Sequence, residues 1–199
     1  MEKPLFIYAA DKNSKEATEL LLLHGANVNE KDKDVGTALH IAAIENSKET
    51  SELLLLHGAN VNEKDKYGET ALHIAAIENS KETSELLLLH GANVNEKDKY
   101  GETALHIAAY KNSKETTEVL LLHGANVNEK DKDVGTALHI AAYKNSKETS
   151  ELLLLHGANV NEKDKDVELL FILQQLKIVK KHPNFFFHMV QMSMKKIKM

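Results

Sequence analysis

Apolar and polar positions follow a helical pattern that recurs along most of the chain. One copy of this pattern reads TALHIAAIENSKETSELLLLHGANVN. In that copy Leu72, Ala75 and Ala76 share one helical face, and the small alanines let a second helix come close. The pattern predicts a helix over Thr70–Ile77, ended by the Asn-Ser pair that follows.

A second helix is predicted over Glu82–His90. The leucine run Leu86–Leu89 supplies its apolar face, and Gly91 follows where a left-handed residue commonly ends a helix. Two helices this short cannot bury four leucines by themselves. We therefore expect each helix pair to stack on identical neighbours and to share a continuous core.

Both patterns return with a period of 33 residues. Self-similarity at one fixed period indicates a repeat protein, in which each unit mainly contacts its neighbours. The TALHIAA segment begins at Thr37, Thr70, Thr103 and Thr136, and the HGANVNEKDK segment begins at His24, His57, His90, His123 and His156.

The repeated unit resembles the ankyrin repeat. The family motif T-P-L-H-x-A appears as Thr70–Ala75 and the motif G-A-x-V-N as Gly91–Asn95, and the resemblance covers residues 5–167. It implies an all-α ankyrin-repeat solenoid of stacked helix-turn-helix units with projecting hairpin loops and a concave face. It also implies that Thr70 and His73 are hydrogen-bonded to each other and that the units contain no catalytic residue.

The period divides the chain into successive segments. We predict an N-terminal capping repeat over 1–31, ankyrin repeats over 32–64, 65–97, 98–130 and 131–163, and a degenerate, helical C-terminal cap over 164–199. The first segment lacks the TALH turn, and FIYAA stands there in place of LHIAA, so this unit is suited to close the N-terminal end of the stack.

The last segment no longer shows the repeat. If one base is removed from the glycine codon of GTALHIAAIENSKE, the shifted frame can read ELLFILQQLKIVKK, the sequence of residues 168–181. We interpret the segment as a frameshifted repeat, so its basic, Met- and Phe-rich composition does not indicate a membrane or nucleic-acid site. Gln174 and Gln175 replace the paired alanines, which predicts looser packing than between true repeats.

The hairpin turns depart from the family pattern in two units. Val35 and Val134 occupy the position that holds Gly68 and Gly101 in the central units. A β-branched residue resists positive φ, so we expect the two valine-containing hairpins to adopt a different turn.

Composition and charge narrow the function. The chain has no cysteine, so it has neither a disulfide framework nor a thiolate metal site. Its formal charge is −5 and all 25 basic residues are lysines, so the arginines that usually grip guanine or phosphate are absent. No apolar run approaches the ~18 residues of a membrane span. We expect a cytoplasmic monomer that binds neither nucleic acid nor membrane; association through the apolar C-terminal tail is the alternative.

Polar residues that could carry chemistry recur once per unit and have structural interpretations. Zinc needs ligands about 2 Å away, whereas equivalent histidines such as His73 and His106 lie one repeat apart. We expect the TALH histidines to be hydrogen-bonded within the motif, and loop asparagines such as Asn60 and Asn62 to bond local backbone groups. No serine has a G-x-S-x-G context. The sequence thus predicts no enzyme activity, no metal and no cofactor.

The differences between the repeats are concentrated at the predicted hairpin tips and at the end of the first helix. The resemblance places both sets on the concave face, where tyrosine offers large contact area at low entropy cost. The alternative is that Tyr67 and Tyr100 are simply exposed turn residues. The predicted partner-binding residues are Lys33, Asp34, Ile44, Glu45, Lys66, Tyr67, Glu69, Ile77, Glu78, Lys99, Tyr100, Glu102, Tyr110, Lys111, Lys132, Asp133, Tyr143 and Lys144.

We expect a scaffold or adaptor that binds another protein, whose identity these motifs do not encode. Glu45 and Glu78 lie toward the N-terminal half of the groove and Lys111 and Lys144 toward the C-terminal half. A bound peptide should therefore have the opposite polarity. Two other hypotheses stay open: a truncated remnant of a longer repeat gene without a specific partner, and a regulatory subunit of an enzyme carried on another chain.

Overall fold

The described part of the chain consists of short helices in pairs. The computed structural model describes residues 4–12, 14–34 and 36–162, which contain ten α-helices and no β-strand. The first helix of each pair has seven residues and the second has nine. The helices are α1 (Leu5–Asp11), α2 (Lys15–Leu23), α3 (Ala38–Ile44), α4 (Lys48–Leu56), α5 (Ala71–Ile77), α6 (Lys81–Leu89), α7 (Ala104–Tyr110), α8 (Lys114–Leu122), α9 (Ala137–Tyr143) and α10 (Lys147–Leu155).

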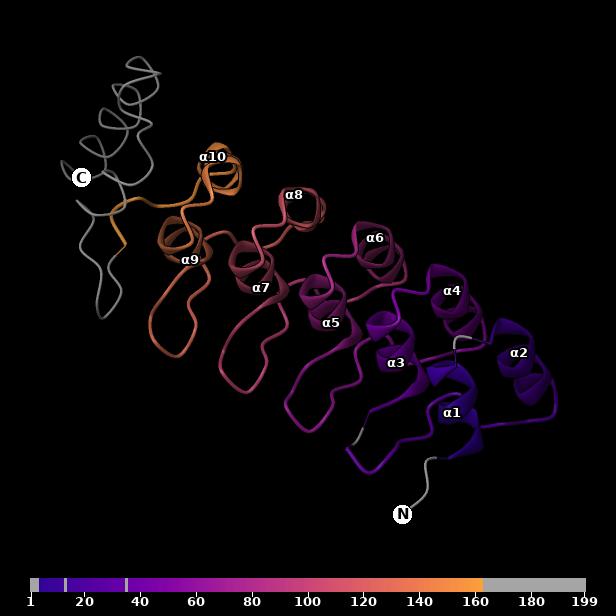
Figure 1. Ribbon diagram of the computed structural model, residues 1–199. Coiled ribbons are helices and arrows are strands. Elements are labelled where there is room, and N and C mark those ends of the chain that lie inside the picture. Colours follow the sequence, from indigo (N-terminus) through magenta and orange to yellow (C-terminus); the bar gives the residue numbers. More distant parts are fainter. Residues whose placement is uncertain (1–3, 13, 35, 163–199) are drawn as a thin grey trace.

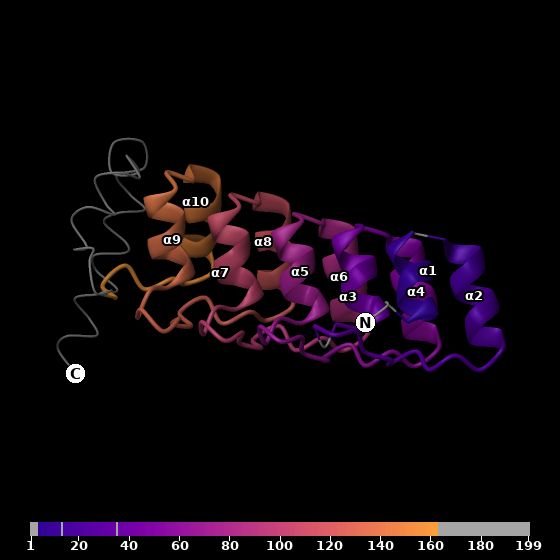
Figure 2. The same ribbon diagram turned by 60° about the horizontal axis from the view of Figure 1, so that its bottom comes forward.

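The helices are arranged in two rows (Figures 1 and 2). Each odd-numbered helix packs on the next odd-numbered helix, each even-numbered helix packs on the next, and the two members of a pair also pack together. In Figure 1 the odd-numbered row lies between the even-numbered row and a series of projecting loops. We call the side with these loops the hairpin side, and the exposed face of the even-numbered helices the outer face. The predicted all-α solenoid of stacked helix pairs is confirmed.

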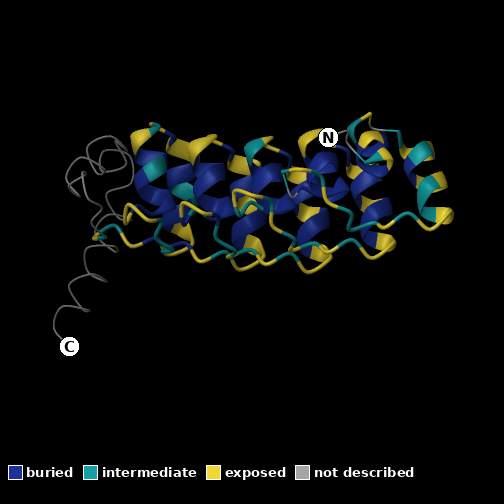
Figure 3. Ribbon diagram, turned by 90° about the horizontal axis from the view of Figure 1, so that it is seen from below, coloured by how far each residue is buried: buried dark blue, intermediate teal, exposed yellow. Residues whose placement is uncertain are grey.

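The hydrophobic core lies between the two rows and is continuous along the stack (Figure 3). Ala75 and Ala76 are fully buried, so their small side chains let α5 pack closely against its neighbours in the odd-numbered row. Leu72 and Leu87 fill the space between the rows and are excluded from solvent. The core of each unit is therefore completed by the units on either side of it.

A threonine and a histidine fix the start of each odd-numbered helix from α3 to α9. Before α5, the Thr70 backbone N–H donates to His73 Nδ1 over 3.1 Å, and the Thr70 hydroxyl lies 2.9 Å from the same nitrogen. Because Nδ1 accepts the backbone N–H, the ring carries its proton on Nε2, which donates to the Glu102 carbonyl over 3.2 Å. The implied Thr70–His73 hydrogen bond is confirmed, and the histidine also ties its unit to the next one.

A serine side chain caps α2, α4, α6 and α8, and at α6 and α8 an asparagine from the preceding unit supports it. Ser80 Oγ accepts from the Thr83 backbone N–H over 3.3 Å, and Thr83 is fully buried. The Asn46 side chain, one unit earlier, accepts from the hydroxyls of both Ser80 and Thr83. Asn46 itself has φ 50°, a left-handed conformation that asparagine tolerates and that ends α3. Ser80 and Thr83 are thus buried with partners, whereas the equivalent buried hydroxyl of Ser146, before α10, has none.

The leucine run of the second helix is only partly in the core, so the expectation that stacking buries all four leucines was wrong. Leu86, Leu87 and Leu88 are at most 9% exposed, whereas Leu89 is 72% exposed. Successive helical residues are rotated by about 100°, so a run of four cannot point to one side. The expected boundary also moves, since α6 begins at Lys81 and ends at Leu89.

The loop asparagines bond partly within and partly between units, which corrects the prediction of local bonding only. Within a unit, Asn60 Oδ1 accepts from the Asn62 backbone N–H over 3.1 Å. Between units, the Asn62 side chain donates to the Gly91 carbonyl over 3.2 Å, and its oxygen accepts from the Asn93 N–H over 2.7 Å. Each loop is therefore fastened to the following loop by side-chain amides.

The first pair of helices continues the stack without the TALH motif. In α1, Phe6 and Ile7 are buried and pack into the core that α1 shares with α3. Tyr8 is exposed, with the Lys12 ammonium 5.4 Å from its ring centre. The predicted C-terminal cap over 164–199, including its helix at 168–181, lies outside the described residues.

Candidate protein-binding surface

Each hairpin tip is built around an aspartate that binds the backbone of its own turn. In the second tip, Asp65 Oδ1 accepts from the Tyr67 N–H over 2.8 Å and from the Glu69 N–H over 2.9 Å. The Gly68 N–H donates to the Asp65 carbonyl, and the Asp65 N–H to the Glu69 carbonyl, each over 3.0 Å. The turn is closed by its own residues, so its side chains are free to face outward.

The valine-containing tip keeps the same turn, so the prediction of a different turn was wrong for Val134. The φ of Val134 is 65°, close to the 77° of Gly68 and the 79° of Gly101. Asp131 Oδ1 accepts from the Asp133 and Gly135 N–H groups over 2.8 Å, as in the glycine tips. The aspartate contacts hold the turn and outweigh the steric preference of valine, which sits in a strained conformation. Val35 lies outside the described residues.

Backbone hydrogen bonds link successive tips into one strip. The Lys66 N–H donates to the Asp34 carbonyl over 3.1 Å, the Lys99 N–H to the Tyr67 carbonyl over 2.9 Å, and the Lys132 N–H to the Tyr100 carbonyl over 3.0 Å. The sequence did not reveal these contacts, because they join residues one unit apart. These hydrogen bonds bring predicted site residues of successive repeats side by side.

Lysines cover the tyrosine rings of the strip. The Lys99 ammonium lies 3.9 Å from the centre of the Tyr67 ring and 4.9 Å from that of Tyr100, within the range of cation–π attraction. Lys66 lies 4.8 Å from the Tyr67 ring and 2.8 Å from Asp34 Oδ1. The hydrogen bond to Asp34 raises the pKa of Lys66 above its usual range. Tyr67, 40% exposed, thus contacts a lysine of its own tip and one of the next unit, whereas Tyr100, 57% exposed, contacts the lysine of its own tip.

The variable ends of the first helices lie in the odd-numbered row. Tyr110 and Tyr143 are 56% and 74% exposed, and the Lys144 ammonium lies 3.5 Å from the centre of the Tyr110 ring. Most of the predicted site residues are exposed, whereas Asp34, Glu69, Ile77, Glu102 and Lys144 are half-buried. Ile77 packs partly against the core, so this member of the predicted set also has a structural role.

An acidic hollow of about 320 Å³ lies between the third and fourth tips, lined by Tyr100, Glu102, Asp131 and Asp133. Burial raises the pKa of Glu102, and the negative charges of Asp98 and Asp131 add to the shift. The pKa of Glu69 is raised in the same way, mainly by burial and then by the negative charges of Asp65 and Asp98. Half-buried carboxylates that repel their neighbours would gain from a cationic side chain of a partner.

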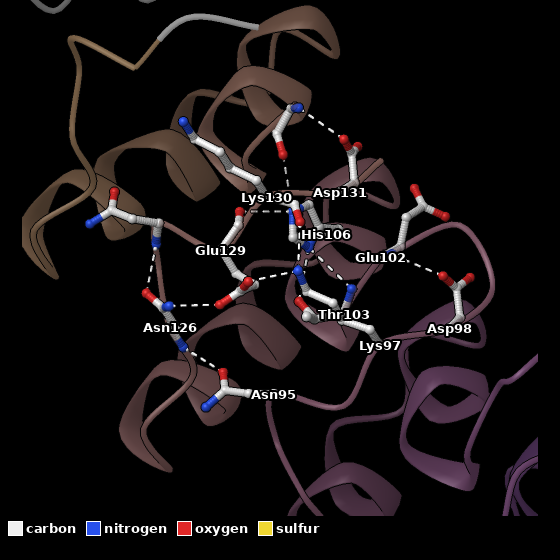
Figure 4. A network of polar contacts seen from close by, with 12 residues as sticks. Asn95, Lys97, Asp98, Glu102, Thr103, His106, Asn126, Glu129, Lys130 and Asp131 are labelled. Atoms are coloured by element: carbon white, nitrogen blue, oxygen red, sulfur yellow. Dashed lines mark hydrogen bonds and ion pairs between the residues drawn. The ribbon is translucent and has the colours of Figure 1, made fainter. Parts of the chain in front are cut away.

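A polar network centred on the buried His106 connects to the tips, as Figure 4 shows. His106 Nε2 donates to the Glu129 carbonyl over 3.1 Å and to the Gly135 carbonyl over 3.3 Å. The Glu129 carboxylate pairs with Lys97 over 2.7 Å, and this hydrogen bond lowers the pKa of Glu129. Burial lowers the pKa of His106, so the ring is neutral. A neutral ring has one nitrogen that accepts, here Nδ1, and one that donates, here Nε2.

The Lys97–Glu129 pair belongs to a series of ion pairs between loops that were not predicted from the sequence. Lysine and glutamate 32 positions apart meet at 2.5 to 2.7 Å in successive units. The sequence does contain a signal for these ion pairs, since the glutamate and the lysine recur in every HGANVNEKDK segment. The pairs are Lys31–Glu63, Lys64–Glu96, Lys97–Glu129 and Lys130–Glu162.

Metal sites and membrane spans are two other classes of site that the described part of the chain lacks. Within residues 4–12, 14–34 and 36–162, no group of three or more histidine, aspartate or glutamate side chains is placed to hold a metal ion. In the same ranges no helix has both the length and the apolar composition needed to cross a membrane. The TALH histidines are accounted for by hydrogen bonds, as described for His73 and His106.

Paired short helices, a shared core and linked hairpins define a helical repeat protein. The family model for ankyrin repeats, which spans three copies, matches residues 6–98 and again residues 85–164. These matches cover most of the 199 residues, so the chain belongs to the ankyrin repeat family. Ankyrin repeats generally mediate contacts between proteins. A search of curated proteins finds no match to this chain.

Proposed function

We propose that this protein is a scaffold or adaptor that binds a partner protein on its hairpin side and has no catalysis of its own. The supporting observation is that most of the positions at which the repeats differ are gathered on one strip of linked tips and on the neighbouring helix ends. Four tyrosines of this set, Tyr67, Tyr100, Tyr110 and Tyr143, are 40% to 74% exposed. Ordered tyrosines supply contact area without a large loss of side-chain entropy.

The charge of this surface changes along the stack, which favours one direction of binding. Glu45 and Glu78 end the first helices of the N-terminal half, and Lys111 and Lys144 end those of the C-terminal half. Glu45, Glu78 and Lys111 are exposed, so they can meet a partner without losing a buried contact. A bound segment with basic residues toward the N-terminal half and acidic residues toward the C-terminal half fits this arrangement.

A capture experiment with charge-reversed variants tests the proposal. The protein is immobilised, and bound proteins from a lysate are compared for wild type, for Lys111→Glu/Lys144→Glu and for the matched outer-face control Lys81→Glu/Lys114→Glu. We expect the first variant to lose the proteins that wild type and the control retain. For an isolated partner, we expect a lower association rate and a weaker dependence on salt.

The same experiment distinguishes the alternatives. If wild type and both variants retain the same proteins, the hairpin side is not the binding surface. If nothing is retained specifically, the remnant hypothesis is favoured over the adaptor. If the retained protein is an enzyme whose activity changes on binding, the regulatory-subunit hypothesis is favoured.

A further inference from the structure

The outer face presents a row of leucines that the core does not use. Each even-numbered helix ends in a leucine, and each of these is 68% to 72% exposed. The preceding aliphatic residues of α6 and α8 are buried, so the exposed leucine is not needed to fill the space between the rows. The row consists of Leu23, Leu56, Leu89, Leu122 and Leu155.

Two glutamates accompany each leucine on the same helical face. In α6 the three residues are Glu82, Glu85 and Leu89, whose spacing of three and then four positions places them in one stripe. Glu82 and Glu85 are exposed, as their equivalents in α2, α4 and α8 are. Neighbouring even-numbered helices pack side by side, so the stripes form a continuous band across the outer face.

The band is acidic. It carries two glutamates from each of five helices and one lysine at the start of each, so its formal charge is five positive less ten negative, or −5. Within the described ranges only one of these glutamates, Glu151, takes part in an ion pair, with Lys147 over 3.6 Å. An apolar row bordered by unpaired carboxylates favours a ligand that is both apolar and cationic.

We propose that the outer face binds a cationic amphipathic helix of a partner protein. Packed helices are about 10 Å apart, so leucines on neighbouring even-numbered helices are separated by about the same distance. A helix rises about 1.5 Å per residue. On a partner helix laid across the row, residues about seven positions apart therefore have the same spacing as these leucines. Positions seven apart share one helical face. A partner helix with one apolar residue per heptad and lysine or arginine beside it therefore meets one leucine and two glutamates in each unit.

This surface is separate from the hairpin side, so the inference does not depend on the proposed function. The test uses the full chain and an amidated synthetic helix of about four heptads, with one leucine per heptad flanked by lysines. The matched control peptide carries glutamate in place of each lysine. Binding is measured by fluorescence anisotropy at low and at high salt.

Three protein variants locate the contact. Leu56→Ser/Leu89→Ser/Leu122→Ser removes the apolar row, and Glu52→Lys/Glu85→Lys/Glu118→Lys reverses the charge beside it. Tyr67→Ser/Tyr100→Ser alters the hairpin side only and is the control. Circular dichroism checks that each variant is folded, which we expect because all the replaced side chains are exposed.

We expect wild type and the hairpin-side control to bind the cationic peptide equally, and the acidic peptide on the order of tenfold more weakly or not at all. The leucine variant should bind on the order of tenfold more weakly, and the charge-reversed variant should also lose the salt dependence of binding. Equal binding by wild type and a folded leucine variant, or no binding by wild type, would overturn the proposal.

A second copy of the chain is the other candidate occupant. Residues 177–199 contain six lysines and no acidic residue, so they have the required charge. Sedimentation of wild type and of the leucine variant distinguishes this case. Concentration-dependent association of wild type that the leucine substitutions abolish would overturn the proposal in favour of self-association.

Discussion

The TALHIAA segments pack between repeats and form a buried seam. The sequence of this seam varies less from repeat to repeat than that of the hairpin tips. Along the seam, TALHIAA is identical in the four units that contain it, whereas the tips carry Asp-Val-Gly in two units and Tyr-Gly-Glu in the other two. In the seam each histidine uses both ring nitrogens, one within its unit and one toward the next unit. A tip needs only its aspartate and its backbone to close the turn. Of these two regions, the one whose side chains the fold needs less therefore varies more.

The strongest test of this comparison replaces a seam histidine. His106→Ala leaves the Thr103 N–H and the Glu129 and Gly135 carbonyls without their partner in a buried site. We expect the free energy of unfolding to fall by about 3 kcal/mol, measured by urea denaturation. The control Lys111→Ala, at an exposed helix end, should change it by less than about 0.5 kcal/mol. Similar losses in the two variants would contradict the distinction.

A reciprocal exchange tests the strain at the tips. In Gly101→Val the new Cβ lies 3.0 Å from the Lys132 nitrogen, at a φ of 79°, and we expect a loss of about 2 kcal/mol. Val134→Gly relieves a valine at φ 65°, and we expect a gain of about 1 kcal/mol after the larger entropy of unfolded glycine is subtracted. Thermal and urea unfolding measure both. A destabilised Val134→Gly would show that the valine is not strained.

The seam also predicts how stability depends on pH. Burial lowers the pKa values of His40, His73 and His106, so below the unfolded value of about 6.5 the unfolded chain binds more protons than the folded one. Their contribution to stability is present above that pH and is lost as pH falls toward the folded values. We expect urea unfolding to show lower stability at about pH 5.5 than at about pH 7.5.

The His106→Gln variant isolates this effect from that of the carboxylates. Burial raises the pKa values of Glu69 and Glu102, so these groups favour folding at low pH and oppose the histidines. The difference in stability between the two pH values should be smaller in His106→Gln than in wild type. An unchanged or larger difference would show that the histidine is not the group responsible.

The smallest effect is expected at a single tip carboxylate. Glu102 is half-buried beside Asp98 and Asp131, which disfavour its charged form. Glu102→Gln removes this repulsion, and we expect a gain of about 0.5 kcal/mol or less near neutral pH. High salt should reduce the gain, since screening weakens the repulsion in wild type. A loss of stability on the same scale would mean that the carboxylate has a favourable contact in the fold.

The sequence predicted the repeat, the helix pairs and the core alanines, because these depend on spacing within one unit. It placed the start of the second helix at Glu82, one residue late, since the helix begins at Lys81 after its Ser80 cap. The exposure of Leu89 was missed because a run of leucines carries no polar residue to mark its outward side.

Contacts between units were harder to predict than those within one. The bond from Asn62 to Gly91 and the contact of Lys99 with Tyr67 join residues 29 and 32 positions apart, and their partners depend on how the units are stacked. The turn at Val134 was missed because the aspartate contacts, not the valine, determine its conformation. Within the candidate site, the exposure of the side chains could be predicted from the differences between repeats. The backbone hydrogen bonds that link successive tips could not.

Hydrogen–deuterium exchange of the complex with a captured partner tests the central claim most directly, namely that the seam maintains the fold and the hairpin side binds. We expect new protection in peptides covering residues 66–69, 99–102, 110–111 and 143–144, and unchanged exchange in the TALHIAA segments of the seam. Protection confined to the even-numbered helices, or absent from the tips, would contradict the account.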